Sequence, residues 1–260
     1  MPTVCLIGNS HVANLKLAWP FVEAEFPGVR TVFFASDGTT MELDVVSGKL
    51  AARADYVRER MATTSGTSGD IEPIYDAYVV CGLTLSSMRT INTYSATMQR
   101  LRAAGRATSA SADDIAHGMA PQVVGSLAFD IASKLRRLTC APIFVIATPL
   151  TAYERHPDMW RRFETRGVVD LLADAFSRAC HNAAREIDAV FVPQPAETVG
   201  PNRLTTRPRF YRLPVTEAAV ERANHAHMNA AFGIIVLRDV LQRIVEALSI
   251  AVVQPSQPSS

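Results

Sequence analysis

Two segments at opposite ends of the chain carry side chains suited to nucleophilic and acid–base chemistry. Near the N-terminus, Ser10 follows a short apolar run that ends at Gly8, and near the C-terminus His227 opens a helical pattern. A serine hydroxyl is a weak nucleophile until a base such as histidine lies within hydrogen-bond distance. The structural alternative for Ser10 is helix capping, which serine also does well. The chemistry therefore requires a fold that brings the two segments together.

Apolar runs that alternate with helical stripes provide such a fold. The short runs predict strands at residues 3–8, 32–36, 77–82, 142–148 and 189–192. Apolar residues at steps of three and four predict helices at 12–26, 88–104, 124–138, 168–187 and 228–248. This alternation is typical of an α/β fold, a three-layer α/β/α sandwich with a mainly parallel, doubly wound sheet of roughly five strands.

The remaining segments complete the expected organisation. Residues 1–252 form one domain, and the Pro- and Ser-rich residues 253–260 form a disordered tail. Residues 63–69 and 107–120 are expected to be loops, while 41–53 is ambiguous and holds at most a short edge strand. Sites in such sheets form at the carboxyl ends of strands, beside the point where the strand order reverses. The residues after the first four strands and the loop before the last helix are therefore the places to look for chemistry.

Composition excludes several classes of function. Hydrophobic residues make up 48% of the chain and charged residues 20%, which supports a large core and excludes wholesale disorder. The net charge of +1 provides no field for nucleic acid or an anionic membrane. No apolar run is long enough for a spanning helix, and no basic segment precedes the first run as in a secretion signal. The four cysteines form no C-x-x-C pair, so we expect buried reduced thiols in a cytoplasmic protein.

Two short motifs resemble a known family. Gly8-Asn9-Ser10, together with Asn224-x-x-His227 and the following Met228-Asn229 and Phe232-Gly233, resembles the first and last blocks of the SGNH (GDSL-like) hydrolase superfamily, in the form associated with surface polysaccharide loci. The resemblance implies a flavodoxin-like fold and acyl transfer to water. In that reading Ser10 attacks an ester carbonyl and His227 is the base.

The resemblance also implies groups that stabilise the negative oxygen of the intermediate. The backbone N–H groups of Ser10 and of Gly38 are the expected donors, and Gly82, Thr84 and Asn9 are the further candidates for the oxyanion or the substrate. Thr84 stands where the family has asparagine, and losing such a donor costs on the order of 10²–10³ in rate. Asn224 stands where the family has the acid, and the like change in a serine protease costs about 10⁴.

Other candidates are weaker. His225 and His227 could begin a metal site, but no third and fourth ligand follow at suitable spacing, so we expect no metal. No glycine-rich nucleotide motif is present, so we expect no cofactor. Three arginines before the last block form either a solvated basic loop or a contact to an anionic or sugar substrate. Two aromatic residues after the fourth strand either stack on a sugar ring or pack in the core or at its rim. These residues are Arg203, Arg207 and Arg209, and Tyr153 and Trp160.

Three functions follow from these observations. The first is a serine esterase that acts on a small-molecule or glycan ester, with an O-acylated and in particular an O-acetylated carbohydrate as the substrate class. The second is a weakly active or inactive relative that serves as a binding protein, which Thr84 and Asn224 favour. The third is an acyltransferase, because hydrolysis and transfer share the acyl-enzyme step. The oligomeric state and the role of residues 105–121 stay open.

Overall fold

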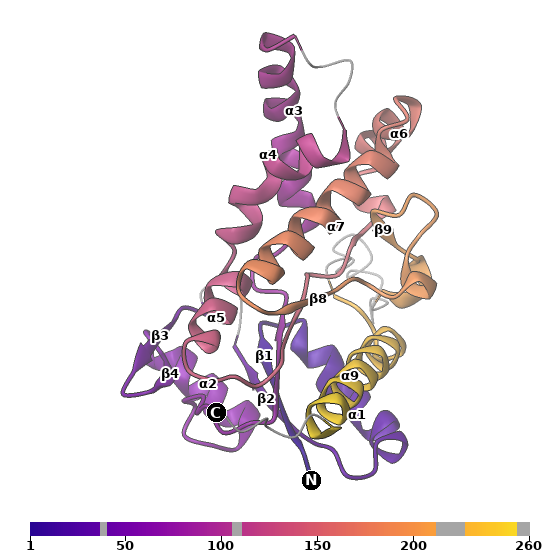
Figure 1. Cartoon of the computed structure of the whole chain (residues 1–260). Coiled ribbons are helices and arrows are strands. Elements are labelled where there is room, and N and C mark those ends of the chain that lie inside the picture. The colour runs from indigo at the N-terminus through magenta and orange to yellow at the C-terminus, as the bar shows by residue number, and fades with distance from the viewer. Residues whose placement is uncertain (37–40, 106–110, 212–226, 254–260) are drawn as a thin grey trace.

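The computed structural model describes residues 1–36, 41–105, 111–211 and 227–253. Five parallel strands form a central sheet in the order β2-β1-β5-β6-β8, with helices on both faces (Figure 1). These strands are β1 (Thr3–Gly8), β2 (Arg30–Ala35), β5 (Ala77–Cys81), β6 (Ile143–Ile146) and β8 (Val190–Val192). The expected three-layer α/β architecture is confirmed. The strand order reverses between β1 and β5, so their carboxyl ends flank the position where such sheets bind ligands.

The helices and the short strands complete the chain. Eight α-helices are described: α1 (Val12–Val22), α2 (Asp55–Ser65), α3 (Ser87–Ala103), α4 (Ala112–Val124), α5 (Leu127–Arg136), α6 (Pro157–Thr165), α7 (Val169–Glu186) and α9 (Ala230–Val253). Short 3₁₀ turns lie at η1 (Glu23–Glu25), η3 (Tyr153–Arg155), η4 (Ala196–Thr198) and η5 (Pro208–Phe210). Two small sheets pair β3 (Leu43–Val46) with β4 (Lys49–Ala52), and β7 (Thr151–Ala152) with β9 (Thr205–Thr206).

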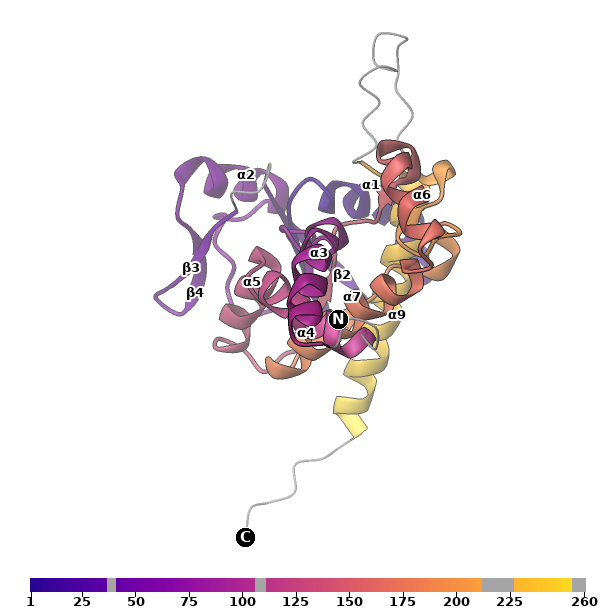
Figure 2. The ribbon, with the colours of Figure 1, turned by 90° about the horizontal axis from the view of Figure 1, so that it is seen from above.

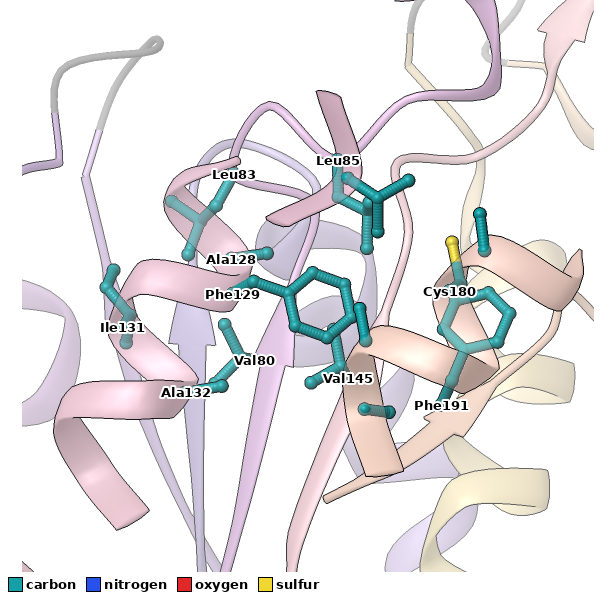
Figure 3. Packing of buried hydrophobic residues seen from close by; sticks show 14 of the residues in the cluster. Val80, Leu83, Leu85, Ala128, Phe129, Ile131, Ala132, Val145, Cys180 and Phe191 are labelled. Atoms are coloured by element: carbon teal, nitrogen blue, oxygen red, sulfur yellow. The ribbon is translucent and has the colours of Figure 1, made fainter. Parts of the chain in front are cut away.

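The central strands are apolar because the sheet is covered on both faces. Successive side chains of a strand point to opposite faces, so each strand contributes to two cores. In β5, Tyr78 and Val80 pack with α2, α4, α5 and α7, while Val79 packs with α1 and α9. Figure 2 shows α2 and α5 on the side of the molecule opposite α9. Figure 3 shows part of the larger core, where Val80, Phe129 and Val145 meet.

A glycine sets the position of the last helix. A Cβ atom at Gly233 would clash with the backbone carbonyl oxygen of Asn14 and would lie 3.1 Å from the Cβ of Ala18. The absence of a side chain at Gly233 therefore lets α9 approach α1 closely, and Figure 1 shows the two helices side by side. Since α1 follows Ser10 and α9 follows His227, this packing holds both segments at one end of the sheet.

Several boundaries differ from the expected ones. Residues 107–120 were expected to be a loop, but α4 begins at Ala112, where Ser111 and Asp114 form a reciprocal capping box. The expected helix at 124–138 is divided, because α4 ends at Val124 and α5 begins after Ser126, whose hydroxyl accepts a hydrogen bond from the backbone N–H of Phe129. The expected loop at 63–69 is helical up to Ser65.

Two further expectations concern the segment at 41–53 and the C-terminal tail. Residues 41–53 hold a two-stranded antiparallel hairpin, β3–β4, outside the central sheet. The tail expected at 253–260 lies outside the described residues except for its first residue, which ends α9. Among the described residues, no helix combines the length and the apolar character needed to cross a bilayer.

Candidate active site

The structure brings Ser10 and His227 into contact, although 217 positions separate them. The Nε2 atom of His227 lies 3.1 Å from the Oγ atom of Ser10. Ser10 sits in the turn between β1 and α1, where the backbone N–H of Val12 donates to the carbonyl oxygen of Asn9 (2.9 Å). The residue at the N-cap of α1 is His11, which makes no side-chain cap. The Ser10 hydroxyl therefore interacts with an imidazole and does not serve as the cap of α1.

The start of α9 positions His227. Met228 forms an antiparallel bridge to Tyr211. Asn229 caps α9, because its Oδ1 atom accepts the backbone N–H of Phe232 (3.1 Å). Its Nδ2 group donates to the carbonyl oxygens of Arg209 (2.8 Å) and Tyr211 (3.3 Å). Asn229 was part of the quoted motif but had no expected role, and the structure makes it the tie between the helix and the preceding loop.

A second imidazole lies beside this pair. The ring centroid of His11 is 5.9 Å from that of His227. Burial, and secondly the charge of a protonated His227, lower the pKa of His11 from 6.5 to about 4. His11 is therefore neutral at pH 7, and its Nδ1 atom is buried without a hydrogen-bond partner among the described residues. Sequence reasoning did not single out His11, although its place directly after Ser10 was a usable signal.

A tight turn after β5 lies against the Ser10 loop. Gly82, Leu83 and Thr84 all have positive φ, at 77°, 47° and 65°. A Cβ atom on Gly82 would lie 2.9 Å from Asn9 Oδ1 and 3.2 Å from His11 Cδ2, so only glycine fits there without displacement. Asn9, which is 7% exposed, accepts the backbone N–H of His11 through Oδ1 (3.2 Å). The turn and Asn9 together shape the loop that carries Ser10.

The expected oxyanion donors have different outcomes. The backbone N–H of Gly82 donates to the carbonyl oxygen of Ile146 (2.9 Å), so this N–H is engaged in the sheet, while a contact of Gly82 with the substrate stays a prediction. The Oγ1 atom of Thr84 accepts the backbone N–H of Leu127 (3.0 Å) at the start of α5, and its role as an oxyanion donor stays a prediction. Gly38 and Asn224 lie outside the described residues.

The buried thiol nearest the candidate site does not compete with Ser10 as a nucleophile. Cys5, Cys81 and Cys180 are buried, whereas Cys140 is exposed, contrary to the expectation that all four would be buried. Burial raises the pKa of Cys81, the cysteine at the carboxyl end of β5, to about 12. A thiol with such a pKa is protonated at pH 7 and is a poor nucleophile.

The other polar and aromatic candidates have structural partners. Trp160 is completely buried and packs edge-on against Phe163, so the suggestion that it stacks on a sugar ring is wrong. The phenol of Tyr153 donates to Glu164 (3.2 Å). The guanidinium of Arg203 pairs with Asp170 and Asp174, that of Arg207 donates to the carbonyl oxygen of Val199, and that of Arg209 lies over the ring of Phe210.

Within the described ranges, no three His, Cys, Asp or Glu side chains cluster in a way that could hold a metal ion. His225, the other half of the H-x-H pattern, lies outside those ranges. No protein-family model matches this chain, and no curated protein is significantly similar to it. The geometry of the Ser10–His227 pair is therefore the observation on which function is argued.

Proposed function

We propose that the protein is a serine ester hydrolase that acts on an O-acylated carbohydrate. The observation that carries this proposal is the distance of 3.1 Å between Ser10 Oγ and His227 Nε2. A serine alone is a poor nucleophile, and a histidine at hydrogen-bond distance is the usual means of activating it. The carbohydrate part of the proposal rests on the motif resemblance to SGNH hydrolases. The substrate is then a small-molecule or glycan ester.

The geometry supports a two-step acyl transfer. Ser10 Oγ attacks the ester carbonyl carbon and gives its proton to Nε2 of His227, in the tautomer that carries its hydrogen on Nδ1. The C–O bond to the alcohol then breaks, and His227 returns that proton to the leaving oxygen. In the second step water attacks the acyl-enzyme, His227 accepts the proton of the water, and the acid leaves as Ser10 recovers a proton.

A cytoplasmic location is part of the proposal. Its support is that all four cysteines are unpaired, which suits a reducing compartment. A sugar hydroxyl that replaced water in the second step would make the same dyad an acyltransferase. Product analysis separates the two reactions, because hydrolysis releases the free acid and transfer yields a new ester.

Hydrolysis of an activated ester tests the proposal. We expect Ser10→Ala and His227→Ala each to lower kcat/KM for p-nitrophenyl acetate on the order of 10³-fold or more, because nucleophile and base act as a unit. The matched control is Ser249→Ala, the same substitution at an exposed position of α9, which should keep the wild-type rate. Equal rates in the wild type, Ser10→Ala and His227→Ala would exclude the esterase and favour a binding protein.

A further inference from the structure

A large cavity lies beyond the carboxyl ends of the central strands. Its volume is about 430 Å³, and its walls come from the ends of β5, β6 and β8, from α7, and from α1 and α9. Apolar side chains dominate the wall, among them Ala173 and Phe176 of α7 and Phe232 and Val236 of α9. Cavities of roughly 300–1,000 Å³ with mainly apolar walls are the usual binding places for small molecules.

The longest polar side chains on the wall, those of Gln194, Arg203 and Arg207, are engaged by the protein itself. The side-chain carbonyl of Gln194 accepts the backbone N–H of Leu150 (2.9 Å), and its amide donates to the hydroxyl of Thr206 (3.0 Å). Arg203 points its guanidinium at Asp170 (3.1 Å) and Asp174 (2.6 Å). A sugar in this cavity would lose many hydrogen bonds to water, and the few other polar groups on the wall could replace only some of them. An apolar group loses no hydrogen bonds on entering such a site.

The cavity reaches the candidate active site at His11. His11 forms part of the wall and directly follows Ser10, while its ring lies 5.9 Å from the ring of His227. The cavity is therefore one side chain away from the dyad. The leaving alcohol must lie beside His227, which returns its proton, so the group that remains on Ser10 after the first step is the one that can extend along His11.

We propose that this cavity binds the acyl chain of the ester, and that this chain is a medium-length aliphatic group and not acetyl; the inference rests on the proposed esterase function. An acetyl group has a single methyl beyond its carbonyl and would leave nearly all of the cavity empty. A cavity of about 150 Å³ already holds benzene. The volume here therefore has room for a chain such as hexanoyl or octanoyl.

A series of p-nitrophenyl esters tests the chain length. We compare acetate, butyrate, hexanoate and octanoate as substrates of the full-length protein. Burying one methylene in an apolar site contributes enough to raise kcat/KM by about threefold to fourfold. We therefore expect kcat/KM to rise at each step from acetate to at least hexanoate, because each added methylene enters the cavity.

Two substitutions on different walls link the preference to this cavity. Ala173→Leu on α7 and Val199→Phe in the loop after η4 both add volume to the lining. We expect each to lower kcat/KM for octanoate at least about tenfold and to change the rate on acetate less than about twofold. The matched control is Ala103→Leu on the exposed side of α3, which should keep the wild-type preference.

The outcomes separate this inference from the proposed function. Hydrolysis of acetate at least as fast as octanoate overturns the acyl cavity and leaves the esterase standing. If none of the esters is hydrolysed, the proposed function fails, and calorimetric binding of octanoate decides the cavity alone. Binding to the wild type that weakens in Ala173→Leu supports an apolar-chain site, and no binding to the wild type overturns it.

Discussion

At the scale of single residues, the unusual group is the buried imidazole of His11. Burial and the neighbouring His227 lower its pKa to about 4, so it carries no charge at neutral pH. This neutrality matters for the proposed reaction, because His227 becomes an imidazolium when it takes the proton of Ser10. A charged neighbour at a ring distance of 5.9 Å would oppose that step, and a neutral one does not.

The lowered pKa of His11 has a consequence for stability. Above its unfolded pKa of 6.5, His11 is neutral in both states and contributes no pH dependence. As the pH falls from 6.5 toward 4, His11 takes up its proton in the unfolded state first. The free energy of unfolding therefore falls by up to about 3 kcal/mol. We expect His11→Gln to remove this part of the loss, which urea unfolding at about pH 7 and about pH 5 would measure.

The matched control for this test is His117→Gln, at an exposed position of α4. That variant should lose as much stability on acidification as the wild type does. An equal loss in His11→Gln and in the wild type would contradict the assignment of the pH dependence to His11.

At the scale of elements, the start of α9 decides where the base stands. Asn229 stands two residues after His227. It caps the first turn of the helix and donates to the carbonyl oxygens of Arg209 and Tyr211. Gly233 holds the same helix against α1. The imidazole is thus positioned from two sides, by a hydrogen-bonded cap and by a close helix contact.

We expect Asn229→Ala to weaken both stability and turnover. The lost cap costs about 1 kcal/mol in unfolding free energy. The loosened helix start misplaces His227, which should lower kcat about tenfold or more with a smaller change in KM. Ser111→Ala is the matched control, because it removes the cap of α4 at similar cost and should leave kcat unchanged. An unchanged kcat in Asn229→Ala would show that Asn229 does not position the base.

Elements differ in how well the sequence predicts them. The central strands are predictable because burial on both faces makes them short continuous apolar runs, as in β1 and β5. Helix α4 was missed because small polar residues surround its apolar positions, yet Ile115, Met119 and Val123 recur at steps of four and are fully buried. The Ser111–Asp114 capping pattern was also visible. The hydrogen bonds that Asn229 makes to the preceding loop are not visible in the sequence, because their acceptors lie about twenty residues earlier in the chain.

At the scale of the whole molecule, topology explains why the dyad could be expected and the cavity could not. The carboxyl ends of parallel strands lie at one edge of the sheet, so the sequence predicts that the loops that carry Ser10 and His227 lie at that edge. The cavity instead depends on how α7, α9 and three strand ends leave space between them. Periodicity in the sequence predicts helices and strands, but it does not predict a cavity between them. The same limit applies to Trp160 of α6, whose complete burial in the larger core the sequence does not show.

The central claim is that His227 activates Ser10 as a nucleophile. Mass spectrometry after reaction with a fluorophosphonate tests it most directly, since this probe forms a covalent bond with an activated serine and requires no knowledge of the natural ester. The account predicts one adduct on the peptide that contains Ser10, no adduct in Ser10→Ala, and labelling at least on the order of 10²-fold slower in His227→Ala. Labelling at another residue, or at the same rate without His227, would contradict the claim.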